Sequence, residues 1–209
     1  MAWGRGAGER RRPSAFSAVI AALVVVALVI AGIAAWQVWG TSWRASAATR
    51  QAMSDFSAGC SAGRAQADQN VVAVMSIPSL GVETPVVRGV GKDSLRRGVG
   101  WYPDTAAPGQ SGNFAVAGYR ITNGAPLRHI LQLKDGDQIR VRDCRHSYTY
   151  SVEMPASGLT VGADAGWVLD AVPGHPERIP SQALMTITAN QDQVPSDQRA
   201  VLFARLVTG

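Results

Sequence analysis

The chain has 209 residues, enough for one ordinary domain with additional segments. Its formal charge of +5 is concentrated at the N-terminus, because four arginines and one glutamate in the first fourteen residues carry +3 of it and leave +2 for the rest. The basic balance is therefore a property of the tail, and it does not indicate a protein that binds nucleic acid.

A long apolar segment follows the basic tail. Residues 18–36, AVIAALVVVALVIAGIAAW, contain no charged side chain and are about long enough to cross the hydrocarbon core of a bilayer as a helix. Arginines precede the segment, and tryptophans lie at and beyond its end, as expected at a membrane interface. The sequence therefore predicts a cytoplasmic tail over residues 1–14 and a single-pass transmembrane anchor over 15–39, with the rest of the chain outside the cytoplasm.

A cleaved signal peptide is the alternative interpretation of this segment. The residues Ala-Ser-Ala at 45–47 have the small side chains of a cleavage site. However, the apolar segment is long for a signal peptide, and the site lies well past its end. We therefore favour an uncleaved anchor over a signal peptide, and over a buried helix of a soluble domain.

The next segment, residues 40–69, is rich in alanine and serine, contains no proline and shows little apolar face. This composition predicts a helical or semi-flexible stalk. The stalk contains Cys60, and the only other cysteine is Cys144. These two residues are candidates for a disulfide, but the sequence leaves their pairing open. Cys144 and His146 are too few ligands for a closed zinc site, so we expect no metal.

From residue 70 to residue 209, short β-rich runs alternate with glycine and proline. The runs DQIRVRD and SYTYSVEM flank the short link CRH, and the alternation in each predicts a hairpin with Cys144 at its tip. VVAVMSI, GNFAVAGY, ALMTITA and RAVLFARLV are further strand candidates. We expect a mainly β domain over 70–209, with about seven to eight strands and short helices, folded as a barrel or a sandwich.

Several stretches of this domain, taken in order, carry a resemblance to a known family. They are IPSLGVETPVVRGV, LRRGVGWYPDTAAPGQSGNFAVAGYR, GAPLRHILQLKDGDQIRV, WVLDAVPGHPERIPSQALMTIT and RAVLFARL. In this order they resemble a sortase, most closely the class E sortases of Gram-positive cell envelopes. The resemblance runs from residue 71 to residue 209, and it implies a sortase-like β-barrel.

This resemblance implies a transpeptidase chemistry. A sortase cuts a sorting peptide at a Thr–Gly-type bond and passes the acyl group to an amine. In that family a cysteine thiolate forms the acyl-enzyme, a histidine gives a proton to the leaving amine, and an arginine stabilises the tetrahedral oxyanion. The chemistry uses no cofactor, and we expect none here.

Two of these three catalytic residues are replaced in this chain. The family's Ala-Gly-His-Arg is similar to Ala-Gly-Tyr-Arg here, which places Tyr119 at the histidine position and Arg120 after it. The family's Thr-Cys-His-Pro is similar to Thr-Ala-Asn-Gln here, which places Ala189 at the cysteine position. A shift by one residue would place Thr188 there instead. Neither alignment has a thiol.

The family's arginine has a counterpart in Arg199, within the run DQRAVLF. One interpretation is a solvated charge at the start of a strand. The other is a guanidinium that still holds a carbonyl or a carboxylate in the cleft. In that case Tyr119 and Asn190 are donors or stacking surfaces of a binding groove, whose further candidate residues are Thr188, Arg120 and Asn123. The alternative is that these residues have drifted in a pocket that is no longer used.

These substitutions lead us to expect that the standard chemistry is lost. Alanine cannot form a covalent intermediate, and a phenol, with an ordinary pKa of about 10, is a poor proton shuttle at neutral pH. Three functions stay open. The protein binds a sorting-signal-like peptide or an envelope protein, it is a subunit that works with an active sortase, or it is a transpeptidase or hydrolase that uses other residues such as Thr188. We favour the first.

Overall fold

The computed structural model describes residues 23–32, 41–63, 70–190 and 197–209. Residues 23–32 are helical. The remainder of the predicted anchor and the whole of the predicted cytoplasmic tail lie outside the described residues. Within the described ranges, no helix is long and apolar enough to cross a membrane.

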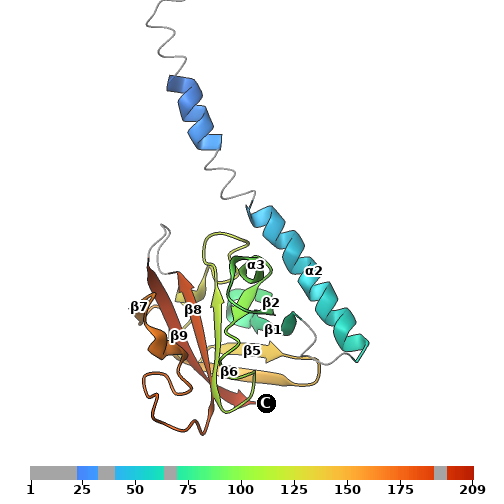
Figure 1. The fold of residues 1–209 in the computed structure, drawn as a ribbon, viewed down its shortest axis with the longest axis vertical. Coiled ribbons are helices and arrows are strands. Elements are labelled where there is room, and N and C mark those ends of the chain that lie inside the picture. The colour runs from blue at the N-terminus through green and yellow to red at the C-terminus, as the bar shows by residue number, and fades with distance from the viewer. Residues whose placement is uncertain (1–22, 33–40, 64–69, 191–196) are drawn as a thin grey trace, which may run out of the picture.

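Nine strands of the described chain form a single sheet. They are β1 (Val71–Ile77), β2 (Val82–Arg88), β3 (Val99–Trp101), β4 (Gly112–Gly118), β5 (Gln138–Arg142), β6 (Ser147–Met154), β7 (Thr160–Gly162), β8 (Ala183–Asn190) and β9 (Gln198–Thr208). Eight of them close a barrel in the order β6-β5-β1-β2-β3-β4-β8-β9, because β9 also pairs with β6. β7 pairs with β9 outside this ring. The predicted mainly β barrel is confirmed (Figure 1).

Short helical turns connect some of these strands. They are η3 (Pro78–Leu80), α3 (Lys92–Leu95), η4 (Ile130–Gln132) and η5 (Gly166–Leu169). One turn depends on a glycine, because η3 ends at Gly81 with a φ of 62°, in the left-handed region that favours this residue. The N–H of Gly81 donates to the carbonyl of Pro78 and closes the turn into β2.

The predicted hairpin is formed by β5 and β6, which pair antiparallel along their length. β5 alternates exposed and buried side chains, as expected for a strand with one face on the core. In the turn, the carboxylate of Asp143 accepts hydrogen bonds from the N–H groups of Arg145 and His146, both at 2.7 Å. These bonds fix the tip of the hairpin, where Cys144 lies.

The main core fills the interior of the barrel. Its largest fully buried side chains come from most of the strands: Met75, Ile77, Phe114, Ile139, Tyr150, Met185 and Leu202. On β8 the core residues are Met185, Ile187 and Ala189, at every second position. Side chains alternate between the two faces of a strand. Thr186 and Thr188 therefore point to the opposite face of β8, where they are also buried.

A helix packs against the barrel where the sequence predicts a stalk. This helix, α2 (Thr41–Ser61), lies against β1 and β2. Its Ala52 and Phe56 are buried against Val74 of β1 and Val87 of β2 in a second apolar cluster. Figure 1 shows α2 along one side of the barrel. The segment is helical, and α2 is docked on the barrel.

A disulfide reinforces this docking. Cys60, in the last turn of α2, is joined to Cys144 at the tip of the β5–β6 hairpin, with 5.1 Å between the two Cα atoms. The pairing that the sequence leaves open is therefore formed in the structure. Because the chain contains two cysteines, it has no free thiol.

Candidate functional site

Three neighbouring strands bring the sequence-predicted positions to one end of the barrel. β4 runs parallel to β8 with Gly118 opposite Ala189, and Tyr119 follows Gly118 directly. β9 runs antiparallel to β8 with Arg199 opposite Asn190. Neighbouring strands lie about 4.8 Å apart. Tyr119, Ala189 and Arg199 therefore lie at the same end of three adjacent strands.

The position predicted for the nucleophile carries only a methyl group. Ala189 is 2% exposed and belongs to the main core. Its cross-strand partner on β9 is Ala200, which is also buried. A methyl group cannot attack a carbonyl, donate a proton or accept one. Whatever binds at this end of the barrel therefore meets no nucleophile at Ala189.

The alternative nucleophile, Thr188, points to the other face of β8 and is 5% exposed. Its hydroxyl lies 3.4 Å from the carbonyl oxygen of Val116, to which it donates. It also lies 3.4 Å from the phenol oxygen of Tyr102. A hydroxyl needs a neighbouring base to become a good nucleophile, and neither of these groups is one. The contacts of Thr188 are those of a structural hydroxyl.

Polar and charged side chains lie at or beside this end of the three strands. Tyr119, Arg120 and Arg199 are each half-buried. The backbone carbonyl of Tyr119 accepts a hydrogen bond from the N–H of Leu127 at 3.1 Å, which holds the start of the loop after β4. A guanidinium is a planar group with five N–H donors, well suited to carbonyl and carboxylate oxygens. This end of the barrel therefore keeps hydrogen-bond donors and positive charge without a nucleophile.

Two other residues of the predicted groove have different outcomes. The backbone of Asn190 pairs with Arg199, and its side chain lies outside the described part of the chain. Asn123 lines a cavity between α2 and β2 whose lining includes neither Tyr119 nor Ala189. Its amide donates to the hydroxyl of Thr122 at 3.2 Å. The membership of Asn123 in the groove stays a prediction.

A buried polar network that the sequence did not predict lies nearer the opposite end of β4 from Gly118 and Ala189. Asn113 of β4 is 1% exposed, and its amide donates to the carbonyls of Val168 at 2.9 Å and Asp170 at 3.0 Å. Its carbonyl oxygen accepts a bond from the Thr186 hydroxyl at 2.7 Å. The network fixes the segment around η5 against β4 and β8. An asparagine inside the apolar run GNFAVAG was the signal, since a buried amide needs partners.

Comparison with known proteins defines the class of this fold and site. A family model of the sortase domain matches residues 75–207, which is more than half of the chain. The closed barrel agrees with that match. The chain belongs to the sortase family.

Individual relatives are class E sortases. The chain is 32% identical over 184 residues to sortase SrtE1 of Streptomyces coelicolor, a match that covers 82% of this chain and 51% of that one. It therefore spans about half the length of that curated relative. The solved structure of sortase E from Streptomyces avermitilis is 32% identical, with a TM-score of 0.59 over 66% of this chain and 89% of that one.

A second solved structure is sortase E1 from Streptomyces coelicolor with a tripeptide in the active site. It is 28% identical, with a TM-score of 0.58, and the match covers 65% of this chain and 87% of that one. The similarity to class E sortases therefore extends from the sequence to the fold.

Proposed function

We propose that this protein is a membrane-anchored sortase-family protein of a Gram-positive cell envelope that has lost the standard cysteine chemistry. It binds a sorting-signal-like peptide or an envelope protein without cutting it. One observation carries the proposal: Ala189 stands at the nucleophile position, and both cysteines of the chain, Cys60 and Cys144, are joined in a disulfide. The folded chain therefore has no thiolate to form an acyl-enzyme.

The chemical argument follows from the roles of the missing groups. Sortase chemistry proceeds through a thioester, so a chain without a thiol cannot take that route. Tyrosine at position 119 removes the imidazole that protonates the leaving amine. Loss of one member of such a catalytic unit costs several orders of magnitude in rate, and loss of a second adds little. Thr188 offers no replacement, since its hydroxyl is buried and bonded to a carbonyl.

Peptide binding is supported by what remains. Arg199 is half-buried opposite Asn190 on the strand beside Ala189, where its guanidinium can donate to a peptide carbonyl or carboxylate. A related class E sortase, of the same fold, holds a tripeptide in its active site. We propose that the equivalent end of this barrel binds a peptide in the same general manner.

The proposed location rests on two features. The apolar segment over residues 18–36 follows an arginine-rich tail, which favours a single-pass anchor with the N-terminus in the cytoplasm. The Cys60–Cys144 disulfide supports a barrel outside the cytoplasm, because disulfides persist in oxidising compartments. A role as an accessory subunit of an active sortase is compatible with this location.

The test uses the full-length chain purified in detergent. Its ligands are peptides that contain a Thr–Gly bond and carry an N-terminal acetyl group and a C-terminal amide. Calorimetry should detect binding, and Arg199→Ala should weaken it by about 10-fold or more, as expected for a hydrogen bond to a charged group. Arg205→Ala is the matched control, because Arg205 lies on the same strand and pairs with Glu153 at the surface.

Three outcomes would contradict this proposal. If none of these peptides binds, or if Arg199→Ala binds as tightly as the wild type, the retained arginine has no role in a groove. If intact-mass measurements show a covalent acyl adduct on the wild-type chain, the protein is a working catalyst. In that case loss of the adduct in Thr188→Val would identify the attacking hydroxyl.

A further inference from the structure

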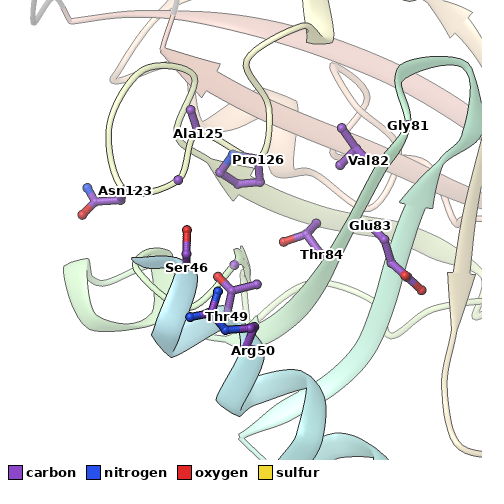
Figure 2. A pocket seen from close by; sticks show the side chains of 12 residues that line it. Ser46, Thr49, Arg50, Gly81, Val82, Glu83, Thr84, Asn123, Ala125 and Pro126 are labelled. Carbon is purple, nitrogen blue, oxygen red and sulfur yellow. The ribbon is translucent and has the colours of Figure 1, made fainter. Parts of the chain in front are cut away.

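A cavity of about 360 Å³ lies between α2, the start of β2 and the loop after β4. We call it the α2 cavity. Its lining comprises Ser46, Thr49, Arg50, Gly81, Val82, Glu83, Thr84, Gly98, Asn123, Gly124, Ala125 and Pro126. Four segments of the chain therefore surround one space, and Figure 2 labels residues from three of them. Its volume is within the range of about 300–1,000 Å³ that small-molecule sites occupy.

A buried hydroxyl without a partner points into this cavity. Thr84 of β2 is 2% exposed, and its hydroxyl oxygen makes no hydrogen bond in the described part of the chain. In Figure 2 the hydroxyl points from β2 towards the space between Pro126 and α2. Buried hydroxyls are nearly always hydrogen-bonded, and each exception requires an explanation. A ligand oxygen in the cavity would supply the missing partner for Thr84.

One face of α2 lines the opposite side. Ser46, Thr49 and Arg50 are spaced three and four residues apart, so they share a helix face. The guanidinium of Arg50 has no ion-pair partner among the described residues. The nearest acidic lining residue is Glu83, but it alternates with Thr84 along β2, and Figure 2 shows its carboxylate pointing away from this space. The lining contains one cation, Arg50, and one anion, Glu83, and Arg50 is the cationic group available to a ligand.

The loop that closes the cavity is held in an unusual conformation. Asn123, Gly124 and Ala125 have φ angles of 53°, 78° and 45°, three consecutive residues in the left-handed region. Alanine rarely adopts this region, and such strain persists only where the surrounding structure enforces it. The N–H of Ala125 donates to the carbonyl of Thr122 at 2.9 Å, and Ala125 is 5% exposed. The turn therefore holds Pro126 over the cavity.

We propose that the α2 cavity binds a small carboxylate ligand, either the C-terminal carboxylate of a peptide or that of a free amino acid. Arg50 donates to the carboxylate, and the Thr84 hydroxyl donates to a second oxygen of the ligand. Val82 and Pro126 contact its apolar part. Guanidinium and carboxylate are geometrically matched, and hydrogen bonds between charged groups are roughly twice as strong as neutral ones. The lining of this site includes neither Ala189 nor Arg199.

The experiment compares two dipeptides that differ only at their C-terminus. The full-length chain in detergent is titrated by calorimetry with N-acetyl-Ala-Ala as the free acid and as the amide. We expect the acid to bind about 10-fold or more tightly than the amide, as one lost charged hydrogen bond requires. Arg50→Gln should remove this preference, because it should lower the affinity for the free acid and leave the affinity for the amide unchanged. Arg140→Gln, at an exposed position of β5, is the matched control and should have no effect.

A second variant separates binding from folding. Thr84→Val removes the buried hydroxyl but keeps the shape of the side chain. It should therefore raise the melting temperature of the protein and lower the affinity for the free-acid dipeptide several-fold. Acetate and free alanine form a further arm: binding as tight as that of the dipeptide assigns the site to small acids, and weaker binding assigns it to a peptide terminus.

The proposal is overturned if the acid and the amide bind equally, if Arg50→Gln leaves the acid unaffected, or if no acid gives heat at millimolar concentration. Its outcome is independent of the peptide groove, because that groove is tested with peptides capped at both ends. Arg199→Ala should leave binding of the N-acetyl-Ala-Ala acid unchanged.

Discussion

Removal of the Cys60–Cys144 disulfide is the most informative test of how α2 is held on the barrel. The perturbation is the double variant Cys60→Ala/Cys144→Ala, which leaves no thiol to mispair. The two residues are 84 positions apart in the sequence. Without the cross-link, the unfolded chain regains the freedom that the closed loop denies it.

The magnitude follows from that loop. The chain-entropy relation for a cross-link of this span gives about 4.5 kcal/mol at 25 °C. The docked helix should nevertheless stay on the barrel, because burial of Phe56, which is 2% exposed, contributes about 1.5–3 kcal/mol. The double variant should therefore lose several kcal/mol of unfolding free energy, while amides in α2 keep part of their protection from exchange. Adding Phe56→Ala should remove that remaining protection.

The assay is urea denaturation of the full-length chain in a non-denaturing detergent, followed by hydrogen exchange of α2. Ser57→Ala is the matched control, since Ser57 is exposed on the same helix and should change stability by less than about 0.5 kcal/mol. A loss below about 1 kcal/mol in the double variant would refute the chain-entropy reasoning. Complete loss of protection in α2 without Phe56→Ala would refute the claim that apolar contacts hold the helix.

Three further predictions follow. Asn113→Ala should lower the unfolding free energy by about 2–4 kcal/mol, because it leaves the Thr186 hydroxyl and two loop carbonyls without partners. Urea denaturation measures this loss, and a loss below about 1 kcal/mol would contradict the prediction. Burial raises the pKa of Tyr150 to about 12, so its contribution to stability is complete below about pH 10 and is lost between about pH 10 and 12. Denaturation at pH 9 to 12 should show a larger loss of stability in the wild type than in Tyr150→Phe, where Tyr148, whose pKa burial also raises, still titrates. The double variant Ala189→Cys/Tyr119→His should form an acyl adduct with capped Thr–Gly peptides, detectable by intact mass. Either single variant should form far less adduct, because the two groups act as a unit. If the double variant forms no adduct, the assignment of these two positions is contradicted.

Much of the fold was predictable because its signals are local. The alternation in QIRVR and SYTYSVEM predicted the β5–β6 hairpin, and the pairing of these strands confirms it. β3 and β7 are three residues long, too short for a periodic pattern, and they exist through pairing with longer strands. The docking of α2 was missed because the face it buries consists of small alanines and the single aromatic Phe56, which does not stand out in an alanine- and serine-rich segment.

The candidate site was predictable to a different extent. The proximity of Tyr119, Ala189 and Arg199 followed from the family resemblance, since each lies at or beside the end of a strand whose order the family implies. The partners of Asn113 and the cavity beside Asn123 were not predictable. They depend on how the loops after β4 and β7 fold back onto the barrel, and no periodicity in the sequence describes such contacts.

Docked α2 links two features that lie apart on the barrel. The disulfide at Cys60 ties down its C-terminal end, and Arg50, ten residues or about 15 Å earlier on the helix, lines the α2 cavity. A ligand that contacts both α2 and β2 stabilises the docked helix. By thermodynamic linkage, a cross-link that favours the docked helix raises the affinity for that ligand by the same factor by which the ligand favours docking. The oxidised chain should therefore bind N-acetyl-Ala-Ala acid more tightly than Cys60→Ala/Cys144→Ala does. Equal affinities would show that the cavity is formed without help from the cross-link.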